Sequence, residues 1–218
     1  MLVIARPVLR WTGVAALTVL ALGCGSRQAS GPREVLDPPR VDLKAHGRLA
    51  LMLFSVENAK GSLHNLATAR FSEWVLAAQP GLEILELGPA DTLVARAGEY
   101  EFGPLSAKRV ADAHHVPVVF LGHLKVSDVK PTAQFQGLTL PRIEAKVTVQ
   151  LSVRLVSTAS GGTLWRASST VTETIGKLGM TGGVPYFSAE DPNEAYGELV
   201  TALVRQVTWD FRPTWRKL

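Results

Sequence analysis

The chain has 218 residues, of which 46% are hydrophobic and 19% are charged. This length suits one ordinary domain with a tail, and the apolar content is enough for a packed core, which excludes a disordered chain. The formal net charge is only +4, and no run rich in lysine and arginine indicates a nucleic-acid binder. The single cysteine, Cys24, excludes an intrachain disulfide, so stability must come from packing.

The first 23 residues have the pattern of a secretory signal peptide. Arg6 and Arg10 give a positive start, Trp11–Leu22 is a short apolar core, and the small residue Gly23 precedes Cys24. About 12 apolar residues fall short of the ~20 that span a bilayer, which disfavours an uncleaved membrane anchor. A buried N-terminal helix is the other alternative. We therefore expect cleavage after Gly23.

The end of this leader resembles a bacterial lipobox. Val19–Cys24 carries the resemblance, although Ala21 stands where leucine is usual and Leu20 lies one place further out. The resemblance implies that Cys24 is diacylated through its sulfur and forms the mature N-terminus. Gly25 follows the cysteine in place of the aspartate that retains such lipoproteins in the inner membrane, which implies the outer membrane.

Residues 24–45 are expected to form the lipidated cysteine and a flexible tether. Gly25–Val41 contains glycine, serine and proline, few apolar residues and no period. Fully extended, this stretch would reach at most ~60 Å, so the folded domain should stay close to the membrane.

Residues 46–218 are expected to form one periplasmic domain. Leu49–Val56 is apolar on both faces, as a central strand covered by helices would be. A helical stripe follows from Leu63 to Ala78 and ends at Pro80-Gly81. We then expect a strand at Leu82–Leu87 and a loop at Gly88–Gly103. A helix should follow from Pro104 to His114-His115, with Leu105 and Val110 on its apolar side. The next strand is expected at Val116–Val126.

The second half of the domain contains the clearest alternation in the chain. In Ile143–Val156 the odd-numbered residues are apolar and the even-numbered ones are polar apart from Val156, which predicts a long antiparallel strand with one face in water. A turn and a returning strand at Thr163–Ile175 complete a β-hairpin. We also expect a polar connection at Ser127–Arg142, a glycine-rich loop at Gly176–Pro192, and a last helix that starts at Asp191-Pro192.

The resulting order, β-α-β-α-β-β-β-α, predicts a single α/β (α+β) domain with a mixed sheet and a long antiparallel hairpin. This order resembles a group of bacterial envelope lipoproteins that includes the curli secretion lipoprotein and the penicillin-binding-protein activator lipoproteins. Three stretches carry the resemblance: Arg48–Val56, with its strand ending in a Phe; Ala111–Leu124, where a strand ends at Gly122; and Val147–Ser169, with Leu164-Trp165 after the turn. The resemblance implies a domain that acts by binding.

Two features separate this chain from those relatives. Curli-type channels carry membrane-spanning hairpins, which need ~9–11 alternating residues per strand, and the three expected loops have room only for very short hairpins. The activator lipoproteins need a long tether to reach their partner enzyme, and this tether is short. A secretion-channel subunit and a peptidoglycan-synthase activator therefore stand as alternatives.

The sequence carries no recognised catalytic or nucleotide-binding motif. The glycine-rich run 176–183 resembles a phosphate loop only superficially, since it lacks the Lys-Ser/Thr ending. A metal site of His114, His115 and His123 is conceivable, but adjacent helical residues point ~100° apart, which favours a helix end capped by the first two. Glu99 and Glu101 are expected to be solvated acids and not a catalytic pair. We expect no metal and no cofactor.

Aromatic residues are the candidates for contacts with a partner. Trp74 and Trp165 are expected in the core. The residues after the last helix, including Phe211 and Trp215, either pack back on the domain or present a surface to a partner. Tyr186 and Phe187 lie in the expected glycine-rich loop, and loops carry function more often than the scaffold does. We therefore select Tyr186, Phe187 and Trp215 as candidate partner-binding residues.

These observations predict a non-catalytic outer-membrane lipoprotein that binds a protein partner as an assembly or accessory factor of the envelope. The lipid anchor at Cys24 would hold it on the periplasmic face. Self-association is left open, nucleic acid is not an expected partner, and an enzyme is the least favoured class.

Overall fold

The computed structural model of the chain describes residues 34–59, 62–127, 130–134, 142–181, 184–187 and 192–217. Its elements follow in the order β1 (Glu34–Asp37), η1 (Leu43–His46), β2 (Arg48–Leu53), β3 (Ser55–Glu57), α1 (Leu63–Ala78), β4 (Glu83–Pro89), α2 (Ala90–Ala97), α3 (Pro104–His114), β5 (Val118–Val126), β6 (Lys130–Gln134), β7 (Arg142–Ser157), β8 (Thr163–Thr181), β9 (Val184–Phe187), α4 (Pro192–Val207), η2 (Trp209–Phe211) and β10 (Thr214–Lys217).

Most strands join one mixed sheet in the spatial order β4-β2-β5-β7-β8-β9. Strands β2 and β4 are parallel, as are β2 and β5, whereas β5, β7, β8 and β9 pair antiparallel in succession. Strand β3 continues beside β5, and β6 pairs with β7. The predicted fold class, with its mixed sheet and long antiparallel hairpin, is confirmed.

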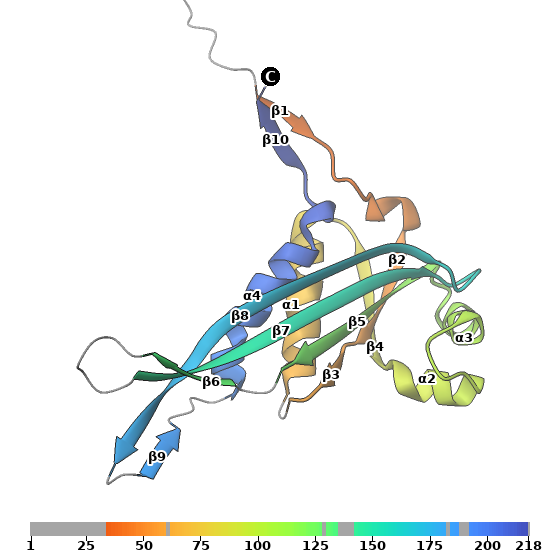
Figure 1. The fold of residues 1–218 in the computed structure, drawn as a ribbon. Helices are drawn as coiled ribbons and strands as arrows, with labels where there is room; N and C mark the ends of the chain where they lie inside the picture. Colours follow the sequence, from red (N-terminus) through yellow and green to blue (C-terminus); the bar gives the residue numbers. More distant parts are fainter. Residues whose placement is uncertain are drawn as a thin grey trace, which may run out of the picture.

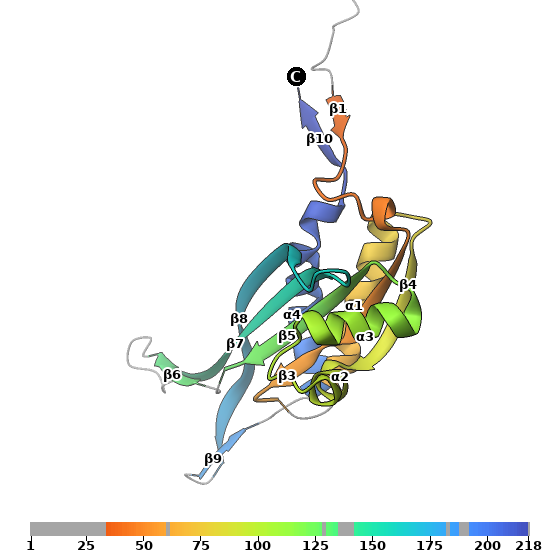
Figure 2. The same cartoon turned by 90° about the vertical axis from the view of Figure 1, so that its right-hand side faces the viewer.

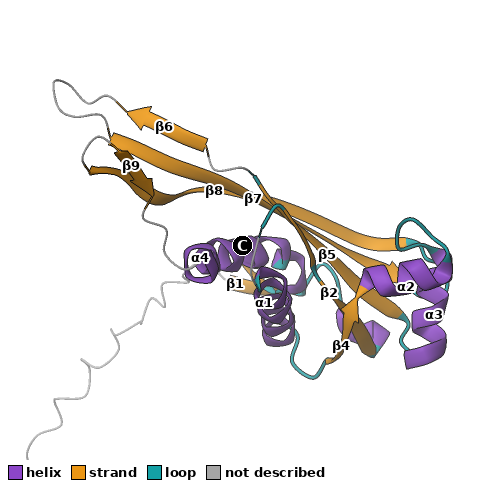
Figure 3. Ribbon diagram, turned by 90° about the horizontal axis from the view of Figure 1, so that it is seen from below, coloured by secondary structure: helices purple, strands orange, loops and turns teal. Residues whose placement is uncertain are grey.

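Helices α1 and α4 cover one face of the sheet, called here the first face, and Figure 3 shows them side by side there. The predicted stripe of α1 is confirmed, since Ala67, Phe71 and Val75 are fully buried at helical spacing. The core between these helices and the sheet contains a chain of aromatic rings with centroids 4.5–6.3 Å apart, formed by Phe54, Phe71, Phe120, Trp165 and Phe211. Val200, Leu203 and Val204 complete this core from α4.

Helices α2 and α3 lie at one end of the opposite face, called here the second face (Figures 2 and 3). They cover apolar residues of β2 and β5, such as Met52 and Val119, with Ala107 and Val110 of α3. Strand β2 is therefore buried on both faces, as predicted. Leu105 was expected on the buried side of α3, but 56% of its surface is exposed, because the helix presents only its Ala107–Val110 side to the sheet.

Helix α2 lies within Gly88–Gly103, where the sequence predicted a loop. This prediction is wrong because the helix is too short for its period to be recognised without its packing partners. Asp91 lies in its first turn, and Gly98 ends it in the left-handed conformation with φ 71°. Leu93 and Val94 pack against the core of the second face.

Two more predicted connections contain strands. Ser127–Arg142 includes β6, which pairs with β7, and Gly176–Pro192 includes the end of β8 and all of β9. The glycines and prolines of these stretches lower strand propensity, but proline is tolerated in β6 and β9 because each is paired with a single neighbouring strand. The predicted strand at Val116–Val126 is confirmed as β5, and it continues past Gly122, where the resemblance implied that the strand ends.

The folded body begins before residue 46. Leu43 is fully buried, and Gln79 joins this segment to the body: its Oε1 accepts the Leu43 N–H at 2.9 Å, while its Nε2 donates to the carbonyl oxygens of Val41 and Phe211. Strand β1, within the predicted tether, pairs with β10. This two-stranded ribbon, β1–β10, projects from the rest of the molecule in Figures 1 and 2.

Candidate functional site

A cleft of about 760 Å³ opens on the second face, where the cover of α2 and α3 ends. Its floor is formed by the sheet, through Gly122 and His123 of β5, Arg154 of β7 and Arg166 of β8. Tyr100 and Phe102, just before α3, form part of its wall. The cleft thus lies where the apolar cover of the second face gives way to polar side chains.

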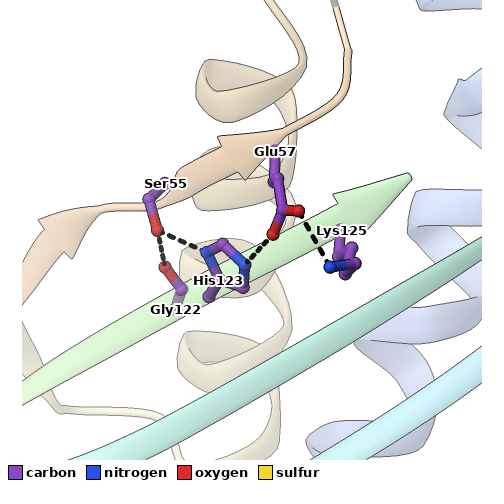
Figure 4. Close-up of polar contacts among 5 residues, drawn as sticks. All are labelled: Ser55, Glu57, Gly122, His123 and Lys125. Carbon is purple, nitrogen blue, oxygen red and sulfur yellow. Dashed lines mark hydrogen bonds and ion pairs between the residues drawn. The ribbon is translucent and has the colours of Figure 1, made fainter. Parts of the chain in front are cut away.

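Four polar residues at this border form a continuous network (Figure 4). Ser55 Oγ lies 2.9 Å from His123 Nδ1 and 3.4 Å from the carbonyl oxygen of Gly122. On the other side of the ring, His123 Nε2 lies 3.4 Å from Glu57 Oε2. Lys125 Nζ donates to Glu57 Oε1 at 2.8 Å.

The network follows from the pleat of two paired strands. In the parallel β3–β5 ladder, Ser55 is opposite His123 and Glu57 is opposite Lys125. Residues two apart share a face of a strand, so all four side chains lie on the second face. Leu124, between them, points to the first face and is fully buried.

The hydrogen bond from Lys125 lowers the pKa of the Glu57 carboxyl below its ordinary value of 4.5, and the contacts with His123 act in the same direction. The order serine, histidine, carboxylate is that of nucleophilic hydrolases, but the ring nitrogens are exchanged: in a catalytic triad the serine contacts Nε2 and the carboxylate contacts Nδ1, whereas here Ser55 contacts Nδ1 and Glu57 lies near Nε2. Such chemistry depends on a site that excludes water. Here the His123 and Glu57 side chains are 49% and 43% exposed, and Lys125 also engages the carboxylate. The arrangement is that of a surface network.

Polar pairs between β7 and β8 form a ladder that continues from the floor of the cleft, which Ser152, Arg154 and Arg166 line. Ser152 and Ser168 are opposite one another with their hydroxyl oxygens 3.0 Å apart, and the next rung towards the hairpin turn pairs Arg154 with Arg166. Arg154 Nη2 donates to the carbonyl oxygen of Phe102 at 3.2 Å. None of these residues was singled out from the sequence, because their proximity depends on the register of the hairpin.

Glu99 has a structural role that the sequence analysis missed. Its carboxylate accepts hydrogen bonds from the backbone N–H groups of Gly103, Leu105 and Ser106 and from the Ser106 hydroxyl, at 2.6–3.3 Å. It therefore caps the first turn of α3 from outside the helix. The Ser106 hydroxyl is the main reason why the Glu99 pKa is lowered, and the backbone donors add to it. The predicted solvated acid is wrong for Glu99, whereas Glu101 is exposed at the cleft.

The three histidines considered for a metal site lie on different parts of the fold. His114 ends α3 and His115 is its C-cap with φ 53°, so the predicted helix end is confirmed. His123 belongs to the network on β5. Among the described residues, no group of three histidine, cysteine, aspartate or glutamate side chains could hold a metal ion.

The candidate partner-binding residues do not form one site. Tyr186 and Phe187 belong to β9, opposite Gly179 and Leu178, and not to a loop. Trp215 lies on β10 opposite Leu36 and is 68% exposed. Figures 1 and 2 place β9 and β10 at opposite ends of the molecule. Cys24 and Gly23 lie outside the described residues.

The other aromatic residues divide between core and surface. Phe211 is fully buried, and Trp165 is partly buried against the core, where its indole N–H donates to Asp210 at 3.2 Å. Trp74 also packs partly against the core, and the Arg212 guanidinium lies over its ring, 4.3 Å from the ring centroid. The C-terminal aromatics therefore split, with Phe211 in the core and Trp215 on the surface.

No protein-family model matches this sequence, and no curated protein sequence matches it. Solved structures of similar fold include the PelC dodecamer from Paraburkholderia phytofirmans, at 13% identity and a TM-score of 0.43 over 84% of this chain and 98% of that one. They also include lipoprotein GNA1162 from Neisseria meningitidis, at 17% identity and a TM-score of 0.35 over 74% of this chain and 98% of that one.

A third similar structure is the C-terminal domain of LpoB from Escherichia coli, at 13% identity and a TM-score of 0.35 over 58% of this chain and 82% of that one. At these scores the likeness establishes neither a family nor a function. Within the part of the chain that the structure describes, no helix has the length and apolar character needed to cross a membrane.

Proposed function

We propose that this protein is a non-catalytic accessory factor of the bacterial envelope, anchored through Cys24 to the periplasmic face of the outer membrane, where it binds a protein partner. The signal-like leader and the lipobox resemblance support the anchor. Gly25 after the cysteine supports the outer membrane.

The exposed β1–β10 ribbon is the observation that carries the binding role. Leu36 and Trp215 are directly opposite and share one face of the ribbon, and they are 47% and 68% exposed. An isolated pair of strands has marginal stability in water. A partner that covers the Leu36–Trp215 pair would bury an aromatic residue of the kind that dominates binding energy at interfaces.

The capture of a partner in intact cells tests this role. Trp215→Ala should reduce the yield of crosslinked partner several-fold with little change in melting temperature, because the side chain is mostly exposed. Trp209→Ala is the matched control, since Trp209 is 53% exposed but lies outside the ribbon. Equal yields for the two variants would remove the ribbon from the binding surface.

The edge strand β9 is a second part of the proposed partner surface. Tyr186→Ala combined with Phe187→Ala should weaken capture without lowering the melting temperature. Because β9 pairs with β8, a loss of stability by more than about 2 kcal/mol would instead assign these aromatics to the fold.

The anchor is tested separately. Cys24→Ala should abolish acylation and release the protein from membranes after a salt wash, since stable anchoring requires the acyl chains. Retention of Cys24→Ala on washed membranes would contradict the lipobox interpretation. Sucrose-gradient fractionation of the unmodified sequence tests the outer-membrane location.

A hydrolase is the second candidate function, because Ser55, His123 and Glu57 contact one another in that order, although with the two ring nitrogens exchanged relative to a catalytic triad. The two candidates are separated by assaying ester and amide hydrolysis by the purified protein and by Ser55→Ala. We expect no activity above background in either. Hydrolysis that disappears in Ser55→Ala would make the second candidate the correct one.

A further inference from the structure

Arg154 and Arg166 place two positive charges directly opposite one another on the second face. They pair across the β7–β8 hairpin, which brings their Cβ atoms to about 5 Å. Like charges in this position destabilise a hairpin. Among the described residues, no acidic side chain forms an ion pair with either guanidinium. No ion pair among the described residues therefore offsets the repulsion between the two arginines.

Both arginines line the cleft. Arg154 is held at the wall, where its Nη2 donates to the carbonyl oxygen of Phe102 at 3.2 Å. Arg166 is exposed and has no such restraint among the described residues. The Ser152 and Ser168 hydroxyls on the next rung add donors beside the pair. The floor of the cleft thus presents several hydrogen-bond donors around two positive charges.

The acidic groups of the cleft belong to its wall. Asp91 is on the first turn of α2, and Glu101 lies between α2 and α3. Neither comes within ion-pair distance of the arginines on the floor. The two arginines of the floor therefore have no ion-pair partner among the described residues.

We propose that this cleft binds an oxyanion, a carboxylate or phosphate group of a ligand, between Arg154 and Arg166. A planar guanidinium matches both groups with two parallel hydrogen bonds, and a bound anion would turn the repulsion between the arginines into attraction. This site does not depend on the proposed partner at the β1–β10 ribbon, which involves different residues.

The binding of two probes to the full chain in detergent tests the proposal. Glutarate supplies carboxylates, inorganic phosphate supplies the other oxyanion, and neutral glutaramide is the control. Each is titrated at constant ionic strength while the melting temperature is followed by tryptophan fluorescence. A saturable rise with glutarate, phosphate or both is expected, because a ligand that binds only the folded state stabilises it. The stronger probe assigns the source of the oxyanion.

Arg166→Gln removes one guanidinium and should weaken probe binding about tenfold, the effect of losing one charge-assisted contact. Arg109→Gln on α3 removes the same charge outside the cleft and should bind as the unmodified protein does. Arg166→Lys keeps the charge but loses the planar fork and should fall between the two. Without a probe, Arg166→Gln should melt no lower than the unmodified protein, since a repulsion is removed.

Equal responses of Arg166→Gln and Arg109→Gln would overturn the proposal, as would a response to glutaramide equal to that to glutarate. A lower melting temperature of Arg166→Gln without a probe would give Arg166 a structural role and also overturn it. Partner capture through Trp215 would be unaffected by any of these results.

Discussion

The two faces of the sheet differ in how completely helices cover them. On the first face, under α1 and α4, the odd-numbered residues of β7 from Val147 to Leu155 are all at most 1% exposed. On the second face, their neighbour Gln150 is exposed and Ser152 is half-buried, because α2 and α3 cover only the end of the sheet near β2 and β4. The same strand thus serves as core on one side and as accessible surface on the other.

This difference explains where function can reside. Residues of the first face are constrained by packing, since protein interiors are close-packed and adding or removing one methylene group changes the stability. The open part of the second face has no such constraint, so it can carry a network such as Ser55–His123 and an arginine pair without loss of the core. We expect substitutions on the two faces to differ accordingly.

The largest effect is expected from placing a charge on the first face. Val149→Asp should destabilise the protein by several kcal/mol, because Val149 is fully buried and an unpaired carboxylate there has no compensation. Gln150→Asp, one residue further on the second face, should be nearly neutral. Chemical denaturation of both variants checks this, and equal losses would overturn the assignment of the faces.

A second effect is expected where Gly122 of β5 lies close to the Phe54 ring on the first face. A Cβ at position 122 would lie 2.4 Å from the ring of Phe54, which is 2% exposed. Gly122→Ala should therefore reduce stability by about 1–3 kcal/mol through overpacking. Gly88→Ala is the control, since nothing lies within 4 Å of its added carbon. The double variant Phe54→Leu with Gly122→Ala should lose less free energy of unfolding than the sum of the losses in the two single variants.

A smaller effect concerns the cap that holds α3 over the second face. The folded state lowers the pKa of Glu99 below 4.5, so near that pH the unfolded chain binds more protons. The stabilisation is complete above pH 4.5 and disappears as the pH falls through the lowered value. Glu99→Gln should melt a few degrees lower than the unmodified protein at pH 7, and the gap should close on acidification. Glu101→Gln is the control at pH 7, where it should melt close to the unmodified protein because Glu101 is exposed. A difference between Glu99→Gln and the unmodified protein that stays constant with pH would contradict the role of Glu99.

The smallest effect is expected at the network on the second face. Ser55→Ala should change stability by no more than about 0.5 kcal/mol, because Ser55 is exposed. Thr68→Val is the contrasting variant, since Thr68 Oγ1 accepts the buried N–H of Phe54 at 2.9 Å on the first face. Leaving that N–H without a partner should reduce stability by about 1–3 kcal/mol. Similar losses in the two variants would show that the network also supports the fold.

The sequence predicted the elements whose residues carry their own period. The stripe from Leu63 to Val75 repeats at helical spacing, and the alternation from Val147 to Leu155 repeats at two, so each element could be assigned with its buried side. Pro104 likewise indicated the start of α3 and His115 its end. These patterns are local signals, because the residues of one helix or strand share a face through the backbone geometry of that element alone.

The tertiary structure decided what depends on pairing between distant segments. Strand β1 exists because Glu34–Asp37 meets Thr214–Lys217, and β6 and β9 exist because they pair with the long hairpin. Ser55 and His123 are 68 positions apart, and only the register of β3 against β5 brings them together. The sequence by itself determined the fold class and the buried face of the hairpin, because the period of apolar side chains fixes which residues share a face. The cleft, the arginine pair and the exposed Trp215 follow from register and strand order, which no local pattern encodes.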